Sequence, residues 1–197
     1  MSKLYFSYSA MNAGKSAILL QAAHNYNERG MRTLLMKPKL DTRDGVPGRI
    51  TSRVGLSAPA DIFTGEDDLT AHILQAHASA AIACVLVDEA QFLSEAQVWQ
   101  LADVADHHDV PVMCYGLRTD FQGQLFPGSA TLLAIADSVR ELRTICWCGR
   151  KASMNLRIDA AGNAVREGEQ VEIGGNDRYV ALCRTHWKQG RVRRSDA

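Results

Sequence analysis

An eight-residue segment near the N-terminus has the residue types of a phosphate-binding loop. It reads SAMNAGKS over residues 9–16, between an expected strand at 3–8 and an expected helix at 15–28. The pattern G-x-x-x-x-G-K-[ST] in this context presents backbone N–H groups to phosphate oxygens at a helix N-terminus. We expect Lys15 to reach the β- and γ-phosphates of a nucleotide and the Ser16 hydroxyl to ligate Mg²⁺. The residues expected around the phosphates are Ser9, Ala10, Met11, Asn12, Ala13, Gly14, Lys15 and Ser16.

Ser9 stands at the position where this pattern has its first glycine. If that position required a positive φ, a serine there would be strained and the loop would be reshaped. The alternative for the whole segment is a chance A-G-K-S sequence at the start of a helix. The expected strand before it and helix after it favour the phosphate loop, because they lie where the mechanism requires them.

Two adjacent carboxylates, Asp88 and Glu89, follow the apolar run AIACVLV at 81–87. Such a run is typical of a strand buried on both faces of a parallel sheet, and ligands bind at the carboxyl edge of such sheets. We expect Asp88 to hold Mg²⁺ together with Ser16. Glu89 is then available as a general base that takes a proton from an attacking hydroxyl. Ala90 and Gln91, which follow directly, are expected beside the same nucleotide.

Two pairs of metal-ligating residues lie in the C-terminal third: Cys146 with Cys148, and Cys183 with His186. Four thiolate or imidazole ligands suit a tetrahedral Zn²⁺ site with no open coordination position, which makes it structural. The ion would close a β unit too small to bury a sufficient core. Spacing alone leaves open the alternative of core cysteines and an unrelated surface histidine.

The elements that must position these residues follow from the hydrophobic pattern. The pattern predicts strands at 3–8, 32–37, 81–87 and 110–115, helices at 15–28, 66–79, 94–107 and 129–138, and an irregular segment at 38–65. Ser94 and Gln97 form a capping-box pattern at one helix start. Alternating strands and helices predict an α/β fold with a parallel sheet flanked by helices, of the P-loop (RecA-like) kind.

The pattern changes after Thr144. Apolar and polar residues alternate over 154–159, a turn follows at 161–163, and further strands are expected at 169–173 and 179–182. We therefore divide the chain into a nucleotide-binding domain at 1–143, a zinc-binding β and lasso domain at 144–190, and a flexible tail at 191–197.

Composition narrows the function further. The 197 residues correspond to one domain, or to one domain with a small appendix. Lys plus Arg and Asp plus Glu each number 22, whereas a nucleic-acid-binding protein usually has a basic excess. No apolar run reaches the roughly 18–20 residues of a membrane helix, and polar residues interrupt the N-terminus too early for a signal peptide. We expect a cytoplasmic protein with reduced cysteines and no nucleic-acid or membrane partner.

Five segments, in this order, together resemble thymidine kinases of the zinc-containing, cytosolic type. They read SAMNAGKS (9–16), DEAQF (88–92), CYGLRTDFQGQLFPGS (114–129), ICWCGRKASMNLR (145–157) and EGEQVEIGGNDRYVALCRTH (167–186), and the resemblance covers residues 3 to 188. It implies transfer of the γ-phosphate of ATP to the 5′-hydroxyl of thymidine, with deoxyuridine as a second acceptor, in nucleotide salvage for DNA synthesis. His186 stands where animal members have cysteine, which indicates the bacterial branch.

The resemblance also implies a thymidine site beneath a lasso at 168–179. Its backbone groups would hydrogen-bond the base edge, so that side chains such as Gln170 and Glu172 could vary. Arg43, within the segment DTR, would lie near the phosphates and stabilise charge on the transferring phosphoryl group. The residues that the resemblance places at thymidine are Met11, Gln91, Phe92, Leu117, Phe121, Phe126, Gln170, Val171, Glu172, Ile173, Gly174 and Tyr179.

Family members assemble as homotetramers and are inhibited by thymidine triphosphate, and both properties are implied here by resemblance. Two functions from other classes stay open. The segment DEAQ at 88–91 resembles a helicase acidic box, although two RecA-like lobes of roughly 100–200 residues each do not fit this chain. A nucleotide-binding switch without an acceptor is the second alternative.

Overall fold

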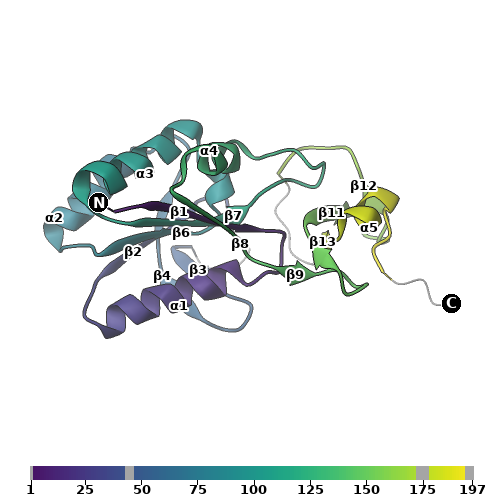
Figure 1. The fold of residues 1–197 in the computed structure, drawn as a ribbon, viewed down its shortest axis with the longest axis horizontal. Coiled ribbons are helices and arrows are strands. Elements are labelled where there is room, and N and C mark those ends of the chain that lie inside the picture. The colour runs from purple at the N-terminus through teal and green to yellow at the C-terminus, as the bar shows by residue number, and fades with distance from the viewer. Residues whose placement is uncertain (1, 43–46, 172–177, 194–197) are drawn as a thin grey trace.

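The computed structural model describes residues 2–42, 47–171 and 178–193. The predictions made for Arg43, Glu172, Ile173 and Gly174 lie outside these residues. Figure 1 shows an elongated molecule with a larger part built on a central sheet and a smaller part that contains the C-terminal strands. Among the described residues, no helix is long and apolar enough to cross a lipid bilayer.

The central sheet has six parallel strands, which confirms the predicted α/β class. Its spatial order is β5-β2-β6-β7-β1-β8. Strand β7 therefore lies between β1 and β6, and the carboxyl ends of β1 and β6 reach the same edge of the sheet. The strands are β1 (Leu4–Ser9), β2 (Thr33–Pro38), β5 (Asp61–Phe63), β6 (Cys84–Val87), β7 (Val112–Leu117) and β8 (Ser138–Glu141).

Helices cover both faces of this sheet (Figure 1). Helix α1 (Lys15–Glu28) and the hairpin of β3 (Arg49–Thr51) and β4 (Ser57–Pro59) lie on one face, where Leu19, Ile50 and Leu86 share a buried cluster. Helices α2 (Leu69–Ser79), α3 (Glu95–His108) and α4 (Pro127–Ile135) cover the other face. There, Phe6 and Leu101 belong to a larger buried cluster. Burying apolar area on both faces stabilises the sheet by roughly 25 cal/mol per Å².

The predicted capping box at the start of α3 is confirmed. The Gln97 backbone N–H donates to Ser94 Oγ at 3.2 Å, and the Ser94 N–H donates to Gln97 Oε1 at 3.1 Å. The Gln97 amide also donates to the Thr64 carbonyl at 2.7 Å. These bonds fix the start of α3 directly after the short 3-10 helix η1 (Ala90–Phe92), which carries the residues following the acidic pair.

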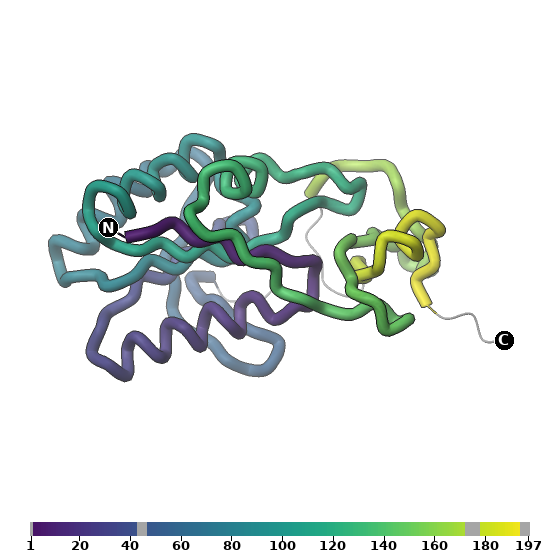
Figure 2. The backbone as a smooth tube through the Cα atoms, viewed as in Figure 1, coloured from purple at the N-terminus to yellow at the C-terminus, as the bar shows by residue number. Residues whose placement is uncertain are grey.

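The C-terminal part is a small β unit with one helix. Strand β11 (Met154–Ile158) pairs with β12 (Ala164–Val165) and β13 (Tyr179–Leu182), and β9 (Thr144–Ile145) pairs with β10 (Lys151–Ala152). Helix α5 (Arg184–Gln189) follows β13 directly. Figure 2 shows the connection after β7 extending toward this unit. The two parts of the chain therefore meet through a loop as well as through the backbone link.

Several predicted elements were wrong because long-range pairing decided them. The segment at 38–65 contains β3, β4 and β5, which at three residues each are too short to show alternation. The helix predicted at 129–138 begins at Pro127 and ends at Ile135, and the exposed strand β8 follows it along β1.

Two further corrections fall in the C-terminal unit. A strand was expected at 169–173, but residues 169–171 are not in a strand. The short strand that follows the turn after β11 and pairs with it is β12, which lies before residue 169 in the sequence. Helix α5 was not predicted at all. It is only six residues long, and it ends at Gly190, which adopts a left-handed conformation (φ 67°).

Helix α4 packs against η1 at a point where Gly128 has no room for a side chain. A Cβ there would lie 2.6 Å from the Leu93 carbonyl oxygen and 2.7 Å from that of Ala90. We expect Gly128→Ala to lower the free energy of unfolding by about 1–3 kcal/mol, even after the helix-propensity gain of about 0.5–1 kcal/mol. Urea unfolding measures the change.

Gly65→Ala is the matched control, because a Cβ at Gly65 meets no atom within 4 Å. It should change stability by no more than about 0.5 kcal/mol. Equal stability of the two variants would contradict the close packing of α4 on η1.

Candidate functional site

The predicted phosphate loop joins β1 to α1, as its mechanism requires. The Lys15 ammonium lies beneath the loop, where it donates to Ser9 Oγ at 3.0 Å and to the Ala10 carbonyl at 3.3 Å. Positive φ falls on Asn12 (66°) and Gly14 (78°), whereas Ser9 is not among the described residues with positive φ. The condition under which Ser9 would be strained is therefore not met, and its side chain supplies an acceptor for Lys15.

The loop meets the acidic pair at the shared edge of the sheet. The Ser16 hydroxyl donates to Asp88 Oδ2 at 2.7 Å, although the two residues are 72 positions apart. Asp88 is buried, and burial followed by the nearby charge of Glu89 raises the pKa of Asp88 to about 6, against a smaller lowering effect of Ser16 and Lys15. A hydroxyl and a carboxylate in contact supply the oxygen ligands that Mg²⁺ prefers, so these residues fit the predicted cation.

Glu89 is held in a specific orientation by backbone and side-chain contacts. It adopts a left-handed conformation (φ 49°), and its N–H donates to Asp88 Oδ1 at 3.0 Å. Its carboxylate accepts a hydrogen bond from the Gln91 amide at 2.5 Å, and Gln91 Oε1 accepts one from the Leu117 N–H at 2.9 Å. The Gln91 amide is thus fixed at both ends, and it holds Glu89 at the wall of a cavity.

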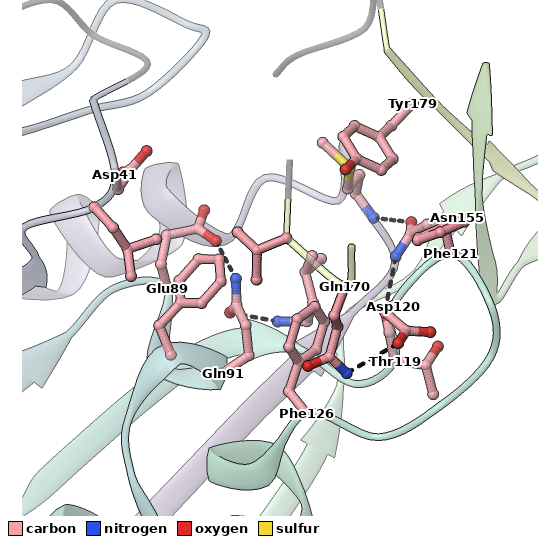
Figure 3. Close-up of a pocket in the computed structure, with 15 residues that line it drawn as sticks. Asp41, Glu89, Gln91, Thr119, Asp120, Phe121, Phe126, Asn155, Gln170 and Tyr179 are labelled. Carbon is pink, nitrogen blue, oxygen red and sulfur yellow. Dashed lines mark hydrogen bonds between the residues drawn. The ribbon is translucent and has the colours of Figure 1, made fainter. Parts of the chain in front are cut away.

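The cavity lies between the sheet edge and the C-terminal unit (Figure 3). All nine described residues that were predicted at thymidine line it: Met11, Gln91, Phe92, Leu117, Phe121, Phe126, Gln170, Val171 and Tyr179. Phe92 and Phe126 meet edge to face, with ring centroids 5.8 Å apart. In Figure 3, Asp41 and Glu89 lie at one end of the cavity and Asn155 and Tyr179 at the other. Apolar walls with a few polar groups are typical of a small-ligand site.

Sequence reasoning missed three polar residues of this wall, Thr119, Asp120 and Asn155. The buried Asn155 accepts from the Met11 N–H at 2.8 Å and donates to the Thr119 carbonyl at 3.3 Å, so it joins the phosphate loop to the segment after β7. Alternation along β11 would ordinarily place Asn155 on a solvent-facing side. The polar residues Asn155 and Arg157 at alternating positions mark one face of the strand, but the pattern gives no signal that this face is covered.

Two other polar contacts shape the opening. Asp120 accepts from the Gln170 amide at 2.9 Å, so the Gln170 side chain has a specific partner in this structure. At the other end, Lys37 lies 3.2 Å from the Asp41 carboxylate, and both side chains are almost fully buried. Asp41 also lines the cavity, beside the segment in which Arg43 had been predicted to act.

The four predicted metal ligands converge in the C-terminal unit. Their ligand atoms all lie within 4.8 Å of one another, with Cys146 Sγ and Cys183 Sγ at 3.4 and 3.5 Å from His186 Nδ1, and Cys148 Sγ at 4.0 Å from Cys183 Sγ. A tetrahedral ion with Zn–S bonds of 2.3 Å would separate two sulfurs by about 3.8 Å. The donor set and its spacing therefore fit zinc. The Trp147 ring stacks on His186, with centroids 3.9 Å apart.

The metal-ligand cluster is linked directly to the cavity through Trp187. Its indole N–H lies 3.1 Å from the Phe121 carbonyl and 3.0 Å from that of Asn155. Trp187 follows His186 in α5, so the helix that carries one ligand also holds two parts of the cavity wall. This contact gives the cluster a structural route to the ligand site.

Comparisons with known proteins place the sequence among one group of enzymes. The family model described as "Thymidine kinase" matches residues 2–187. A thymidine kinase of Ruegeria pomeroyi is 64% identical over 96% of this chain and 95% of its own length. Those of Agrobacterium fabrum and Escherichia coli O157:H7 are 61% and 57% identical, over 95% and 96% of this chain and 96% and 92% of their own lengths.

The raised pKa of Asp88 predicts a pH dependence of stability. An unfolded aspartate has a pKa near 3.9, so from about pH 4 to 6 the folded protein binds the proton more tightly than the unfolded chain does. The contribution of Asp88 to the free energy of unfolding therefore falls as the pH rises through this window. Asparagine does not ionise, so we expect Asp88→Asn to remove that decline. At pH 7 the free energy of unfolding of this variant, measured with urea, should be higher than that of the unaltered protein by roughly 1–3 kcal/mol.

Unfolding is measured at pH 4 and pH 7 without added Mg²⁺ or nucleotide, since a cation would neutralise the buried charge. Asp106→Asn, at an exposed position of α3, is the control. A decline in Asp88→Asn as steep as in the unaltered protein would contradict the role assigned to the buried carboxylate.

Proposed function

This chain belongs to the thymidine kinase family, and from that premise we propose that it transfers the γ-phosphate of ATP to the 5′-hydroxyl of thymidine. The products are ADP and thymidine monophosphate, which places the reaction in nucleotide salvage. One observation supports the chemistry above all. Glu89 lies at the wall of an aromatic cavity directly beside the contact between Ser16 and Asp88.

At the phosphate end, the loop N–H groups and the N-terminus of α1 bind the triphosphate, and Lys15 neutralises its terminal charge. Ser16 and Asp88 are the residues that would hold Mg²⁺, which when bound offsets charge on the β- and γ-phosphates. We also propose that Arg43 acts near the transferring phosphoryl group. The loop residues Ser9, Ala10, Asn12, Ala13 and Gly14, with Ala90, complete the nucleotide site.

At the reacting centre, Glu89 accepts the proton of the thymidine 5′-hydroxyl. The hydroxyl oxygen then bonds to the γ-phosphorus, and the bond from that phosphorus to the β,γ-bridging oxygen breaks, so ADP leaves with the electron pair. Positioning the hydroxyl in line with the phosphorus accounts for most of the rate. The Gln91 amide keeps the Glu89 carboxylate aimed into the cavity.

At the nucleoside end, Phe92, Phe121 and Phe126 enclose the sugar and base. We propose that backbone groups of 170–174 read the base edge, because unmatched polar groups in an enclosed site reject other bases at about 1–3 kcal/mol each. Tyr179 packs at the sugar and base. The contact between Gln170 and Asp120 supports this arrangement by fixing one end of the segment.

We propose a structural zinc ion at Cys146, Cys148, Cys183 and His186, within a C-terminal domain at 144–190 that is distinct from the nucleotide-binding domain at 1–143. The ligand spacing supports the ion, and the contacts of Trp187 explain why it would matter for thymidine binding. We further propose a cytoplasmic homotetramer inhibited by thymidine triphosphate, for which the support is family membership alone.

The function is tested by transfer of label from [γ-³²P]ATP to a panel of nucleosides. We expect labelled thymidine monophosphate, weaker labelling of deoxyuridine, and none of purine nucleosides. ATP hydrolysis that is stimulated by DNA and not by thymidine would overturn the proposal. ATP binding without transfer to any nucleoside would overturn it equally.

Replacing the proposed general base, Glu89, should separate substrate binding from phosphoryl transfer. We expect Glu89→Gln to bind both substrates and yet to lose roughly 10²–10⁴-fold in kcat, the range typical of a general base. Glu95→Gln, in the first turn of α3, is the control and should keep full turnover. Retained turnover in Glu89→Gln would remove Glu89 from the base role.

Removing the metal should separate the two substrates. We expect a zinc chelator, used with Mg²⁺ present, to unfold residues 144–190 and abolish thymidine binding while ATP binding partly persists. His186→Ala should have the same effect, whereas His186→Cys keeps four ligands and should retain both zinc and thymidine binding. Zinc content and calorimetric titration with each substrate measure the outcome. Normal thymidine binding after chelation would contradict the coupling.

A further inference from the structure

Arg157 carries a charge that is buried in the C-terminal unit behind the wall of the cavity. It is 4% exposed and lies on β11, two positions from Asn155 and therefore on the same face of the strand. Taking a charged group out of water costs several kcal/mol unless its donors are matched. The contacts of the guanidinium therefore indicate which parts of the structure Arg157 stabilises.

The partners of Arg157 among the described residues include groups from three separate segments of the cavity wall. Arg157 Nε and Nη2 lie 3.1 and 2.9 Å from the Tyr179 hydroxyl oxygen, and Nη2 lies 2.9 Å from the Glu169 carbonyl and 3.4 Å from that of Gln170. The guanidinium carbon lies 3.8 Å from the centroid of the Phe121 ring. Tyr179, Gln170 and Phe121 all line the cavity, so one planar group joins three parts of it.

We propose that Arg157 is a positioning residue that holds Phe121, Gln170 and Tyr179 in the arrangement that binds the nucleoside. A guanidinium can stack its face on an aromatic ring while its edge N–H groups donate in the same plane. An ammonium is a compact donor without that plane, so lysine could keep the charge but not all the contacts. The inference rests on the proposed function, because it concerns how thymidine is held.

The contacts also predict which substrate is affected. They reach the nucleoside wall, whereas the triphosphate site is built on the loop between β1 and α1. We expect Arg157→Met to raise the thymidine KM roughly 10- to 100-fold and to change the ATP KM by less than about twofold, since hydrogen bonds to charged groups contribute about 1.5–3 kcal/mol. Arg157→Lys should raise the thymidine KM to an intermediate extent. A merely structural role would lower the active fraction without this split.

Arg166→Met is a matched control from the same unit. The Arg166 guanidinium also lies over an aromatic ring, 4.9 Å from the Trp187 centroid, and also donates to carbonyls, those of Trp187 and Lys188. It is exposed and binds α5 instead of residues of the cavity wall. Its removal should leave both KM values within about twofold of the unaltered protein.

Chemical rescue gives a second readout. We expect millimolar guanidinium chloride to lower the raised thymidine KM of Arg157→Ala at least about threefold, because the ion fits the space that the side chain vacates. Equal sodium chloride should not. The unaltered zinc-loaded protein is assayed first. If that protein does not phosphorylate thymidine, the result refutes the proposed function and not the role of Arg157.

With an active unaltered protein, an unchanged thymidine KM in zinc-loaded Arg157→Met overturns the inference. If Arg157→Met does not retain zinc, Arg157→Lys and Tyr179→Phe decide the question, because Tyr179→Phe removes the acceptor and leaves the guanidinium. Both should raise the thymidine KM, and the increase in the double variant should be smaller than the product of the two. Unchanged KM values, or fully multiplicative effects, would overturn the proposal.

Discussion

The hydrogen bond from Ser16 to Asp88 is the contact on which the rest of the site depends. It forms because β7 separates β1 from β6, so that the loop after one strand and the acidic pair after the other reach the same edge of a parallel sheet. A phosphate cradle without the carboxylate would lack a cation ligand, and the carboxylate alone would be a costly buried charge. The raised pKa of Asp88 reflects that cost, which a bound cation would offset.

The second constraint is that the sheet supplies only part of the cavity. The remainder comes from the C-terminal unit, through Asn155 on the phosphate loop and Trp187 on the carbonyls of Phe121 and Asn155. Its buried apolar cluster is small, so a metal held by the four converging ligands would add to its stability. A metal held by this cluster would act on the cavity wall from a distance, through the contacts of Trp187 with Phe121 and Asn155.

The sequence predicted the parts of the site that are specified locally. The loop at 9–16, the carboxylates at 88 and 89, the capping box at 94–97 and the four metal ligands are short patterns whose chemistry sets their spacing. Strands β5 and β8 escaped prediction because pairing with β2 and β1, and not their own pattern, makes them strands. Asn155 and Arg157 escaped for a related reason: alternation indicates two faces of a strand but not what covers each face.

The two adjacent carboxylates differ in their environment, and this difference fits two different tasks. Asp88 accepts a hydrogen bond from Ser16 and lies under the influence of the Lys15 charge, which suits a cation ligand. The backbone at Glu89 is left-handed, and the Glu89 side chain lies at the cavity wall, where the Gln91 amide donates to its carboxylate. The Gln91 amide, itself fixed by the Leu117 N–H, therefore sets the direction of the carboxylate that the proposed mechanism uses as proton acceptor.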